Sequence, residues 1–330
     1  MSIQPRAAGL AVSFVGVLTV AAAALVTAIL TNPAHHSPAS MSHPVTDTPR
    51  VVRAVLPSTP GTYLGVYEPG TEKSYAPIDT YAMAIGRQPN LVLYYNGWGG
   101  GFPLSLATMA REHGATLVID LDPYRASLGS IAHGKQDGYL RSFAEAVLDF
   151  GHPVVISFGH EMNGDWYPWG WTHASPKVFV QAWQHVVTVF RDAGADNVTW
   201  LWTVNNIAAD EPSIRDWWPG SSYVTWVGID GYFYEPADTF RSMYAPTIAV
   251  IRGLTAKPIL ISETAVGQVA GQAAKIPLLF AGTFHYHLLG LLWFDVAQDG
   301  NLLQQNWRLE GHPAAIAAFR RAVKRFLEQA

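Results

Sequence analysis

The sequence contains no cysteine and comparatively few charged side chains. The absence of cysteine from all 330 residues excludes disulfide bonds, thiol nucleophiles and a lipid-modified cysteine. It leaves the cellular compartment open, because many exported proteins have no disulfides. Charged residues make up 14% of the chain, and the formal net charge is −4. A weakly acidic chain is not expected to bind nucleic acid or an anionic membrane surface.

Sequence motifs for several common chemistries are also missing. No Gly-x-Gly-x-x-Gly follows the first strand-like run, so nothing indicates dinucleotide binding. No Gly-x-Ser-x-Gly occurs, which argues against a serine hydrolase. The close histidine pairs, His35-His36 and His285-Tyr286-His287, do not form the His-Glu-x-x-His motif of zinc hydrolases. We therefore expect neither a metal ion nor an organic cofactor.

Apolar and aromatic residues are abundant instead. Hydrophobic residues make up 49% of the chain, which includes 12 Trp, 14 Tyr and 14 Phe. A chain of this length and composition can bury the core of one large α/β domain. The large number of aromatic rings suits a carbohydrate site, because the apolar faces of sugar rings pack on flat aromatic side chains.

The first 60 residues differ in composition from the rest. Residues 7–30 carry no charge and are rich in Ala, Val and Leu. They are long enough for a membrane-spanning helix of about 20 residues, whereas a cleaved signal peptide has an apolar core of about 7–15 residues. Residues 1–30 are therefore predicted to be a membrane anchor or a signal peptide, which makes the protein extracellular or attached to the cell surface. Residues 31–60, rich in Pro, Ser and His, are predicted to form a flexible linker before a folded domain of residues 61–330.

From Gly61 onward, short apolar runs alternate with stretches of helical periodicity. The predicted strands are 63–66, 91–95, 116–121, 154–158, 198–203, 224–229, 259–262 and 288–294. The predicted helices are 103–113, 135–150, 176–193, 238–254, 271–286 and 313–328, with weaker patterns at 79–85 and 211–218.

This alternation predicts the α/β class and a single parallel (β/α)₈ barrel, the TIM barrel. An open doubly wound sheet is the alternative. In a barrel, functional side chains lie just beyond the C-terminal ends of the strands. Polar residues such as Asn96, Asp122, Asn205, Asp230 and Asp295 follow predicted strands at those positions.

The densest group of polar and aromatic residues follows the predicted strand 154–158. Residues 160–171 read His-Glu-Met-Asn-Gly-Asp-Trp-Tyr-Pro-Trp-Gly-Trp. Sugar rings stack on indoles, and a carboxyl group such as that of Glu161 can protonate a glycosidic oxygen. The stretch therefore predicts a site that binds and cleaves a sugar chain. The alternative is a tryptophan-rich loop that packs on its own barrel.

This stretch resembles the acid/base segment of glycoside hydrolase family 26, the β-mannanases and their relatives. A second segment, Pro-Ile-Leu-Ile-Ser-Glu-Thr at residues 258–264, is similar to the family's strand that ends in the nucleophile. The resemblance extends from about Gly61 to the C-terminus. It implies a retaining barrel glycosidase in which Glu161 is the general acid/base and Glu263 is the nucleophile. In such enzymes the two carboxyl groups lie about 5–5.5 Å apart. No Lys or Arg lies within five positions of either glutamate to suggest a salt bridge instead.

The resemblance and the strand-end positions together suggest further residues that bind substrate. Tyr232 matches the family position that hydrogen-bonds the nucleophile, and His160 is expected to orient a carboxylate or a sugar hydroxyl. The other predicted substrate-binding residues are Asn205, Trp166, Trp169, Trp171, Trp293, Trp98 and Asp122. At least one of Trp166, Trp169 and Trp171 is expected to belong to the core.

The substrate is expected to be a β-linked polysaccharide, cleaved in endo fashion by a monomer that meets the membrane only through its N-terminal segment. β-1,4-Mannan is the first expectation, with mixed-linkage β-glucan and β-1,3-xylan as alternatives within the family. The segment Gly-Ile-Asp-Gly-Tyr at 228–232 is similar to the glucan-cleaving branch. One departure is Ser157, where many family members have Arg. A non-catalytic carbohydrate-binding protein of the cell wall is the alternative from another class.

Overall fold

The computed structural model describes residues 56–207, 213–297 and 305–329. The predictions for residues 1–30, and for the linker up to residue 55, lie outside the described residues. Within the described part of the chain, parallel strands form a closed barrel in the order β1 to β8. The strands are β1 (Tyr63–Tyr67), β2 (Leu91–Gly97), β3 (Thr116–Asp122), β4 (Val154–Phe158), β5 (Val198–Asn205), β6 (Trp226–Phe233), β7 (Ile259–Val266) and β8 (Gly290–Phe294).

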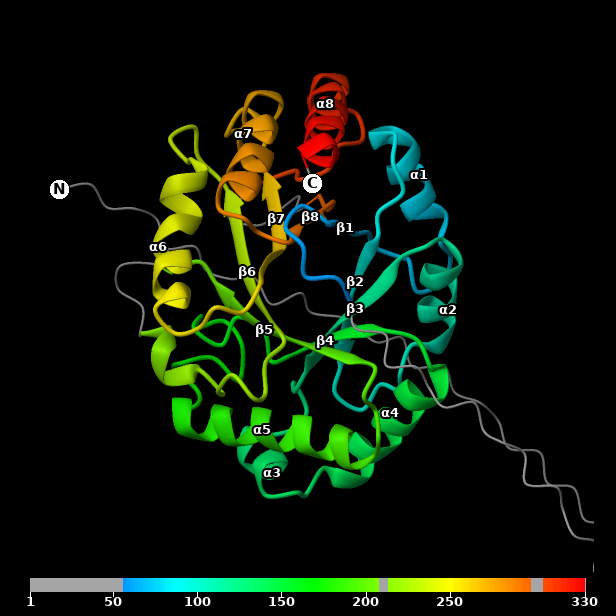
Figure 1. Ribbon diagram of the computed structural model, residues 1–330, viewed down its shortest axis with the longest axis vertical. Coiled ribbons are helices and arrows are strands. Elements are labelled where there is room, and N and C mark those ends of the chain that lie inside the picture. The colour runs from blue at the N-terminus through cyan, green and yellow to red at the C-terminus, as the bar shows by residue number, and fades with distance from the viewer. Residues whose placement is uncertain (1–55, 208–212, 298–304, 330) are drawn as a thin grey trace, which may run out of the picture. The chain divides into compact units, whose positions relative to one another are not determined.

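Helices alternate with the strands and surround them (Figure 1). They are α1 (Ala76–Ile85), α2 (Leu104–Glu112), α3 (Leu128–Ala132), α4 (Asp137–Phe150), α5 (Pro176–Asp192), the 3₁₀ helix η1 (Ile214–Trp217), α6 (Phe240–Arg252), α7 (Gln272–His285) and α8 (Pro313–Gln329). The predicted (β/α)₈ barrel is confirmed for these residues. Helix α3 was not predicted, because five residues are too few to show a helical period.

The strands bury both faces, as their apolar sequences predict. Side chains alternate along each strand, so in β2 Leu91 and Leu93 pack inside the barrel while Val92 packs toward the helices. Gly65 leaves room for this packing, since a Cβ atom there would lie 2.4 Å from Cγ of Leu292. The barrel interior is filled by Tyr63, Leu91, Leu93, Val118, Val155, Leu201, Trp226, Leu260, Leu289 and Leu292.

Helix α5 illustrates how the outer layer forms. Ser175 caps its first turn by accepting a hydrogen bond from Val178 N, and Pro176 occupies the first helical position, where no hydrogen bond is lost. Its buried side chains recur at helical spacing, for example Phe179, Trp183 and Val186, and pack against the barrel. Among the described residues, no helix combines the length and apolar character that crossing a bilayer requires.

Candidate active site

Polar side chains gather at the C-terminal ends of the strands, above the apolar interior. The register pairs Tyr95 of β2 with Asp120 of β3, and Asp120 with Ser157 of β4. These residues therefore occupy one level of the barrel wall. Glu161 follows β4 and Glu263 lies within β7. The two glutamates predicted from the sequence thus enter the same end of the barrel.

Glu161 lies in a tight turn directly after β4. Its φ angle is +52° and that of Gly159 is +57°. A left-handed backbone at a residue other than glycine costs about 1 kcal/mol or more, and such strain is concentrated at functional sites. The turn is anchored to β5, because Glu161 N donates to Thr203 O at 3.1 Å. The surrounding structure therefore holds Glu161 in a conformation that its own sequence would not favour.

Two neutral donors fix the carboxyl group of Glu161. Asn205 Nδ2 donates to Oε1 at 2.6 Å, and Trp166 Nε1 donates to Oε2 at 2.8 Å. Asn205 is itself held by Asn163, whose Oδ1 accepts from Asn205 N at 2.9 Å and whose Nδ2 donates to Asn205 O at 3.0 Å. Asn205 and Trp166, both predicted to lie in the site, contact the carboxyl group of Glu161 directly.

Glu263 is placed by an irregularity in the sheet. The register between β6 and β7 shifts so that Ile229 pairs with Ile261 while Asp230 pairs with Glu263. The extra residue, Ser262, breaks the regular alternation of side chains at this point, and such bulges often re-aim a side chain beside an active site. Both carboxylate oxygens of Glu263 accept hydrogen bonds from phenols: Oε1 from Tyr95 and Oε2 from Tyr232.

Burial and charge raise the pKa of Glu263 to about 7. Loss of hydration is the largest cause, and the nearby charge of Glu161 acts in the same direction. The charge of His160 and the hydrogen bonds from Tyr232 and Tyr95 lower the pKa, because they favour the ionised form. Burial and the charge of Glu161 therefore favour protonated Glu263, whereas the phenols and His160 favour its ionised form.

His160 is buried and forms a hydrogen bond through each ring nitrogen. Nδ1 lies 2.9 Å from Asp122 Oδ1, and Nε2 lies 3.0 Å from the hydroxyl of Tyr167. Burial alone would lower the pKa of His160, but the charges of Asp122 and Asp120 outweigh it and raise this pKa well above its usual value. His160 therefore supplies a positive charge among several carboxyl groups. Asp122 orients this histidine, whereas the sequence predicted that it would bind substrate.

Two further buried acids, Asp120 of β3 and Asp230 of β6, lie in the barrel wall. Burial raises the pKa of both Asp120 and Asp230 well above the usual value for aspartate. Asp230 Oδ1 accepts from Ser262 Oγ at 2.5 Å, while its Oδ2 is buried without a hydrogen-bond partner. An ionised carboxylate in that position would be costly. Burial therefore favours the neutral form of Asp230.

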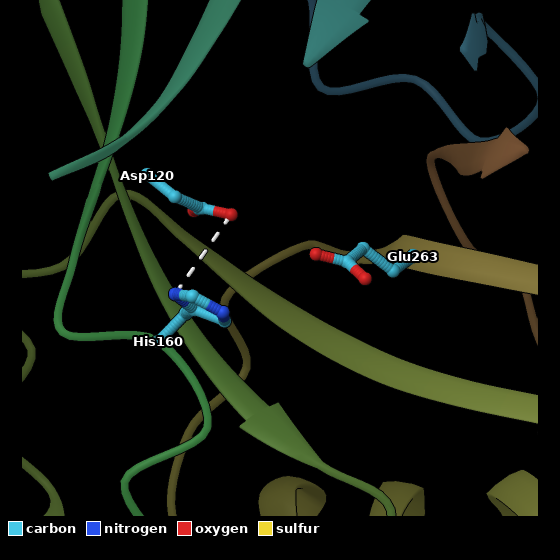
Figure 2. A group of neighbouring side chains, drawn as sticks. All are labelled: Asp120, His160 and Glu263. Atoms are coloured by element: carbon cyan, nitrogen blue, oxygen red, sulfur yellow. Dashed lines mark ion pairs between the residues drawn. The ribbon is translucent and has the colours of Figure 1, made fainter. Parts of the chain in front are cut away.

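Asp120, His160 and Glu263 lie close enough together to offer ligand atoms to one metal ion. One ligand atom from each lies within 4.8 Å of the others, and Figure 2 shows the three side chains facing one another, with the ion pair between Asp120 and His160 at 4.0 Å. Both nitrogens of His160 and both oxygens of Glu263 already take part in hydrogen bonds. Hydrogen bonds and ion pairs therefore already engage these side chains.

The predicted tryptophans have different environments. The ring of Trp171 is 38% exposed and Trp166 is partly buried, so both can meet a ligand. Trp169 is buried, where it donates to His160 O at 2.7 Å and stacks on Tyr167 at 4.6 Å. It therefore supports the backbone of residues 160–171, the acid segment that contains Glu161, and its ring is not open to a sugar.

Trp293 and Trp98 are also buried. Trp293 is 0% exposed; its Nε1 donates to Asp295 Oδ1 at 3.0 Å, and its ring packs on Phe319 of α8. Trp98 packs on Tyr139 at 4.7 Å between ring centroids. These two side chains were predicted to bind substrate, but their burial places them in the supporting structure around the site, because a buried ring offers no face to a sugar.

Sequence reasoning assigned no role to several residues of the site, including Asp120 and Asp230. Tyr95, which donates to Glu263, lies at the end of a predicted strand, and that position was the one signal that could have identified it. Tyr167 stands within the acid segment but was not assigned a role. Its hydroxyl joins His160, and its ring stacks on Trp169.

The site therefore combines two carboxyl groups in different surroundings with an adjoining aromatic surface. Glu161 is bound by an amide and an indole, and Glu263 by two phenols beside a cationic histidine. Two carboxyl groups that face one space can divide the roles of proton donor and nucleophile.

Comparison with known proteins agrees with this geometry. Residues 135–290 match the family model described as glycosyl hydrolase family 26. Over 270 residues the chain is 28% identical to Endoglucanase H of Acetivibrio thermocellus, a match that covers 77% of this chain and 29% of that protein. A mannan endo-1,4-beta-mannosidase of Bacillus subtilis is 31% identical over 152 residues, 41% of each chain. The matches thus span less than half the length of these curated relatives.

A solved structure supports the fold. The modular endo-beta-1,4-mannanase of Cellulomonas fimi superposes with a TM-score of 0.62 at 16% identity, covering 80% of this chain and 71% of that one. The superposition shows the same fold, and the sequence matches agree with the resemblance of the two motifs: over residues 135–290 the chain is similar to glycosyl hydrolase family 26.

Proposed function

We propose that the protein is an endo-acting retaining β-glycoside hydrolase that cleaves a β-linked polysaccharide. The observation that carries the proposal is the pair of glutamates, one directly after β4 and one within β7, each with both carboxyl oxygens held by neutral donors. The exposed ring of Trp171 and the partly buried Trp166 offer surfaces for sugars beside this pair. No feature of the sequence suggests a pocket-shaped site, which favours endo action.

In the first step, Glu161 gives its proton to the glycosidic oxygen while a carboxylate oxygen of Glu263 attacks the anomeric carbon. The bond between that carbon and the leaving oxygen breaks, and a glycosyl ester of Glu263 forms. In the second step, the Glu161 carboxylate takes a proton from water as the water oxygen attacks the same carbon. The ester bond breaks, Glu263 returns to a carboxylate, and the product keeps its configuration after two inversions.

His160 and Asn205 support these steps. The imidazolium of His160 lowers the pKa of Glu263 and so favours the ionised nucleophile. Asn205 and Trp166 hold the carboxyl group of Glu161 in a fixed orientation. Because these donors are held by the protein before substrate binds, they need not reorganise during the reaction.

β-1,4-Mannan is the first substrate of the proposal, as the sequence predicted. The relative in Bacillus subtilis is a mannan endo-1,4-beta-mannosidase, and the superposed structure from Cellulomonas fimi is a mannanase. A β-glucan is the second candidate, because the match to Endoglucanase H extends over 77% of this chain, further than the match to the mannosidase. β-1,3-Xylan stays a third expectation from the family resemblance.

The test is product analysis with the soluble domain, residues 50–330, on mannan, barley β-glucan and xylan. Proton NMR of the first products would report the anomeric configuration before mutarotation. We expect oligosaccharides of retained configuration from one polymer, and a loss of turnover in both Glu161→Ala and Glu263→Ala. Binding of a polymer without any products, by the wild type and both variants alike, would instead identify a carbohydrate-binding protein.

We also propose that the chain is exported and attached to the cell surface, since a polysaccharide of this kind is met outside the cell. The support is the uncharged segment of residues 7–30 and the linker that follows it. Fusion of residues 1–60 to a reporter enzyme tests this. Reporter in the membrane fraction supports an anchor, and reporter in the medium supports a cleaved signal. Reporter found in the cytosol contradicts export.

A further inference from the structure

We propose that Tyr95 is a second positioning residue for Glu263, one that holds its Oε1 from across the barrel while Tyr232 holds Oε2. The proposal rests on the function proposed above, in which Glu263 is the nucleophile. The phenol of Tyr95 donates to Oε1 and the phenol of Tyr232 donates to Oε2, so each carboxylate oxygen has its own donor.

The two phenols approach from different sides. Strand β6, which carries Tyr232, is hydrogen-bonded to β7, which carries Glu263. Strand β2, which carries Tyr95, is separated from β7 by β8 and β1 in the closed barrel. Donors that approach from two sides restrict rotation of the carboxyl group about its last side-chain bond. A single phenol on a neighbouring strand would restrict that rotation less.

An aromatic cluster keeps Tyr95 in place. Its ring packs edge-on against Tyr67 of β1, with 4.9 Å between ring centroids and an interplanar angle of 77°. Tyr67 in turn stacks on Phe294 of β8 at 5.2 Å. Edge-to-face and stacked aromatic pairs have defined geometry. The cluster thus spans β2, β1 and β8. It holds the ring of Tyr95 in the position from which its hydroxyl reaches Glu263.

The chemistry of the contact sets its direction. Burial and the charge of Glu263 raise the pKa of Tyr95 well above its usual value, so its phenol stays protonated and donates. A hydrogen bond to a carboxylate stabilises the ionised form, and the bond from Tyr95 lowers the pKa of Glu263. Loss of the phenol hydroxyl is therefore expected to reduce the fraction of ionised Glu263 at low pH, and to have little effect at high pH.

The variant Tyr95→Phe removes the hydroxyl and retains the ring that packs on Tyr67. Tyr94→Phe is the matched control, because successive side chains of a strand point to opposite faces and Tyr94 packs on the core between barrel and helices. Tyr232→Phe is the reference for loss of the other donor. The substrate is a 2,4-dinitrophenyl β-glycoside of the accepted sugar, whose leaving group departs without a proton from Glu161.

The expected result is a shift of the acid limb of the kcat/KM profile. Loss of one charge-assisted hydrogen bond is expected to raise the pKa of Glu263 by about one unit, from about 7 to about 8. At pH 6 kcat/KM should then fall about tenfold, and at pH 9 it should stay within about twofold of the wild type. Tyr94→Phe should follow the wild-type profile. A Tyr95→Phe profile that parallels the wild type at every pH would overturn the proposal.

A second measurement needs no substrate. In protein labelled with ¹³C at the glutamate carboxyl carbons, the Glu263 resonance is assigned by its absence from Glu263→Gln, and its titration is followed by NMR. A higher midpoint in Tyr95→Phe supports the role of Tyr95, and an unchanged midpoint overturns it. If the wild type cleaves no glycan, the proposed function fails while this titration still decides the contact. Incorporation of 3,5-difluorotyrosine at position 95, a stronger donor, should lower the midpoint.

Discussion

The buried carboxyl group of Glu263 makes a prediction about stability. Its pKa is raised from an ordinary value of 4.5 to about 7, chiefly by burial. The folded protein therefore holds this proton more tightly than the unfolded chain does. By linkage, the contribution of Glu263 to stability is fully present below pH 4.5, declines as the pH rises and is lost above about pH 7. The full difference corresponds to about 3 kcal/mol, at about 1.4 kcal/mol per pKa unit.

Glu263→Gln replaces the titrating group by a neutral one of the same shape. At pH 4.5 the variant and the wild type should have nearly the same free energy of unfolding, because the wild-type carboxyl is then protonated. At pH 8 the variant should be more stable by about 3 kcal/mol. Urea denaturation at a series of pH values measures this difference.

Glu145→Gln on α4 is the control, since its side chain is exposed and its replacement should give no comparable change. A difference between Glu263→Gln and wild type that is constant from pH 4.5 to 8 would refute the reasoning. It would mean that the surroundings of Glu263 do not disfavour its charge. The expected gain also agrees with the general rule that catalytic carboxyl groups are placed at a cost in stability.

Two further predictions follow from the surroundings of the glutamates. Trp171→Ala should raise KM for the polymer about threefold to tenfold and should change kcat by no more than about twofold. The reason is that its exposed ring contributes packing on sugars and touches neither carboxyl group. Steady-state kinetics measure both constants, and an unchanged KM contradicts a binding role. Asp122→Asn should lower the pKa of His160, followed by ¹⁵N NMR, and destabilise the fold by about 3 kcal/mol, because it removes one member of a buried ion pair. An unchanged His160 titration would contradict this pairing.

The sequence predicted the barrel well because its signals are local. Each strand is a short apolar run, and all eight predicted strands coincide with strands of the structure to within a few residues. Since barrel strands run parallel, every strand end points to the same face. That rule alone places Glu161 and Glu263 together, although a hundred residues separate them.

Contacts across the barrel were less predictable. Tyr95 reads as an ordinary strand residue, and only closure of the barrel brings it to Glu263. The tryptophans could not be sorted from sequence either, because the exposure of Trp171 and the burial of Trp293 depend on which helices cover them. The bulge at Ser262 likewise depends on pairing with β6.

Ser157, the position at which the family resemblance leads us to expect Arg, has a structural role that the sequence did not suggest. Its Oγ donates to Thr203 Oγ1 at 3.0 Å, deep in the barrel wall. Its partner residue Thr203 also accepts, through its backbone oxygen, the hydrogen bond that fixes the Glu161 turn. In this chain the cation near Glu263 is His160, which two buried aspartates hold.

The central claim is that Glu263 forms a covalent bond to the sugar. The measurement that tests it most directly is mass spectrometry of the intact protein and its peptides after incubation with a 2-deoxy-2-fluoro glycosyl fluoride of the accepted sugar. We predict one added glycosyl group, located on the peptide that contains Glu263 and absent from Glu263→Gln. Turnover of the polymer with inverted products and no label on Glu263 would contradict the account.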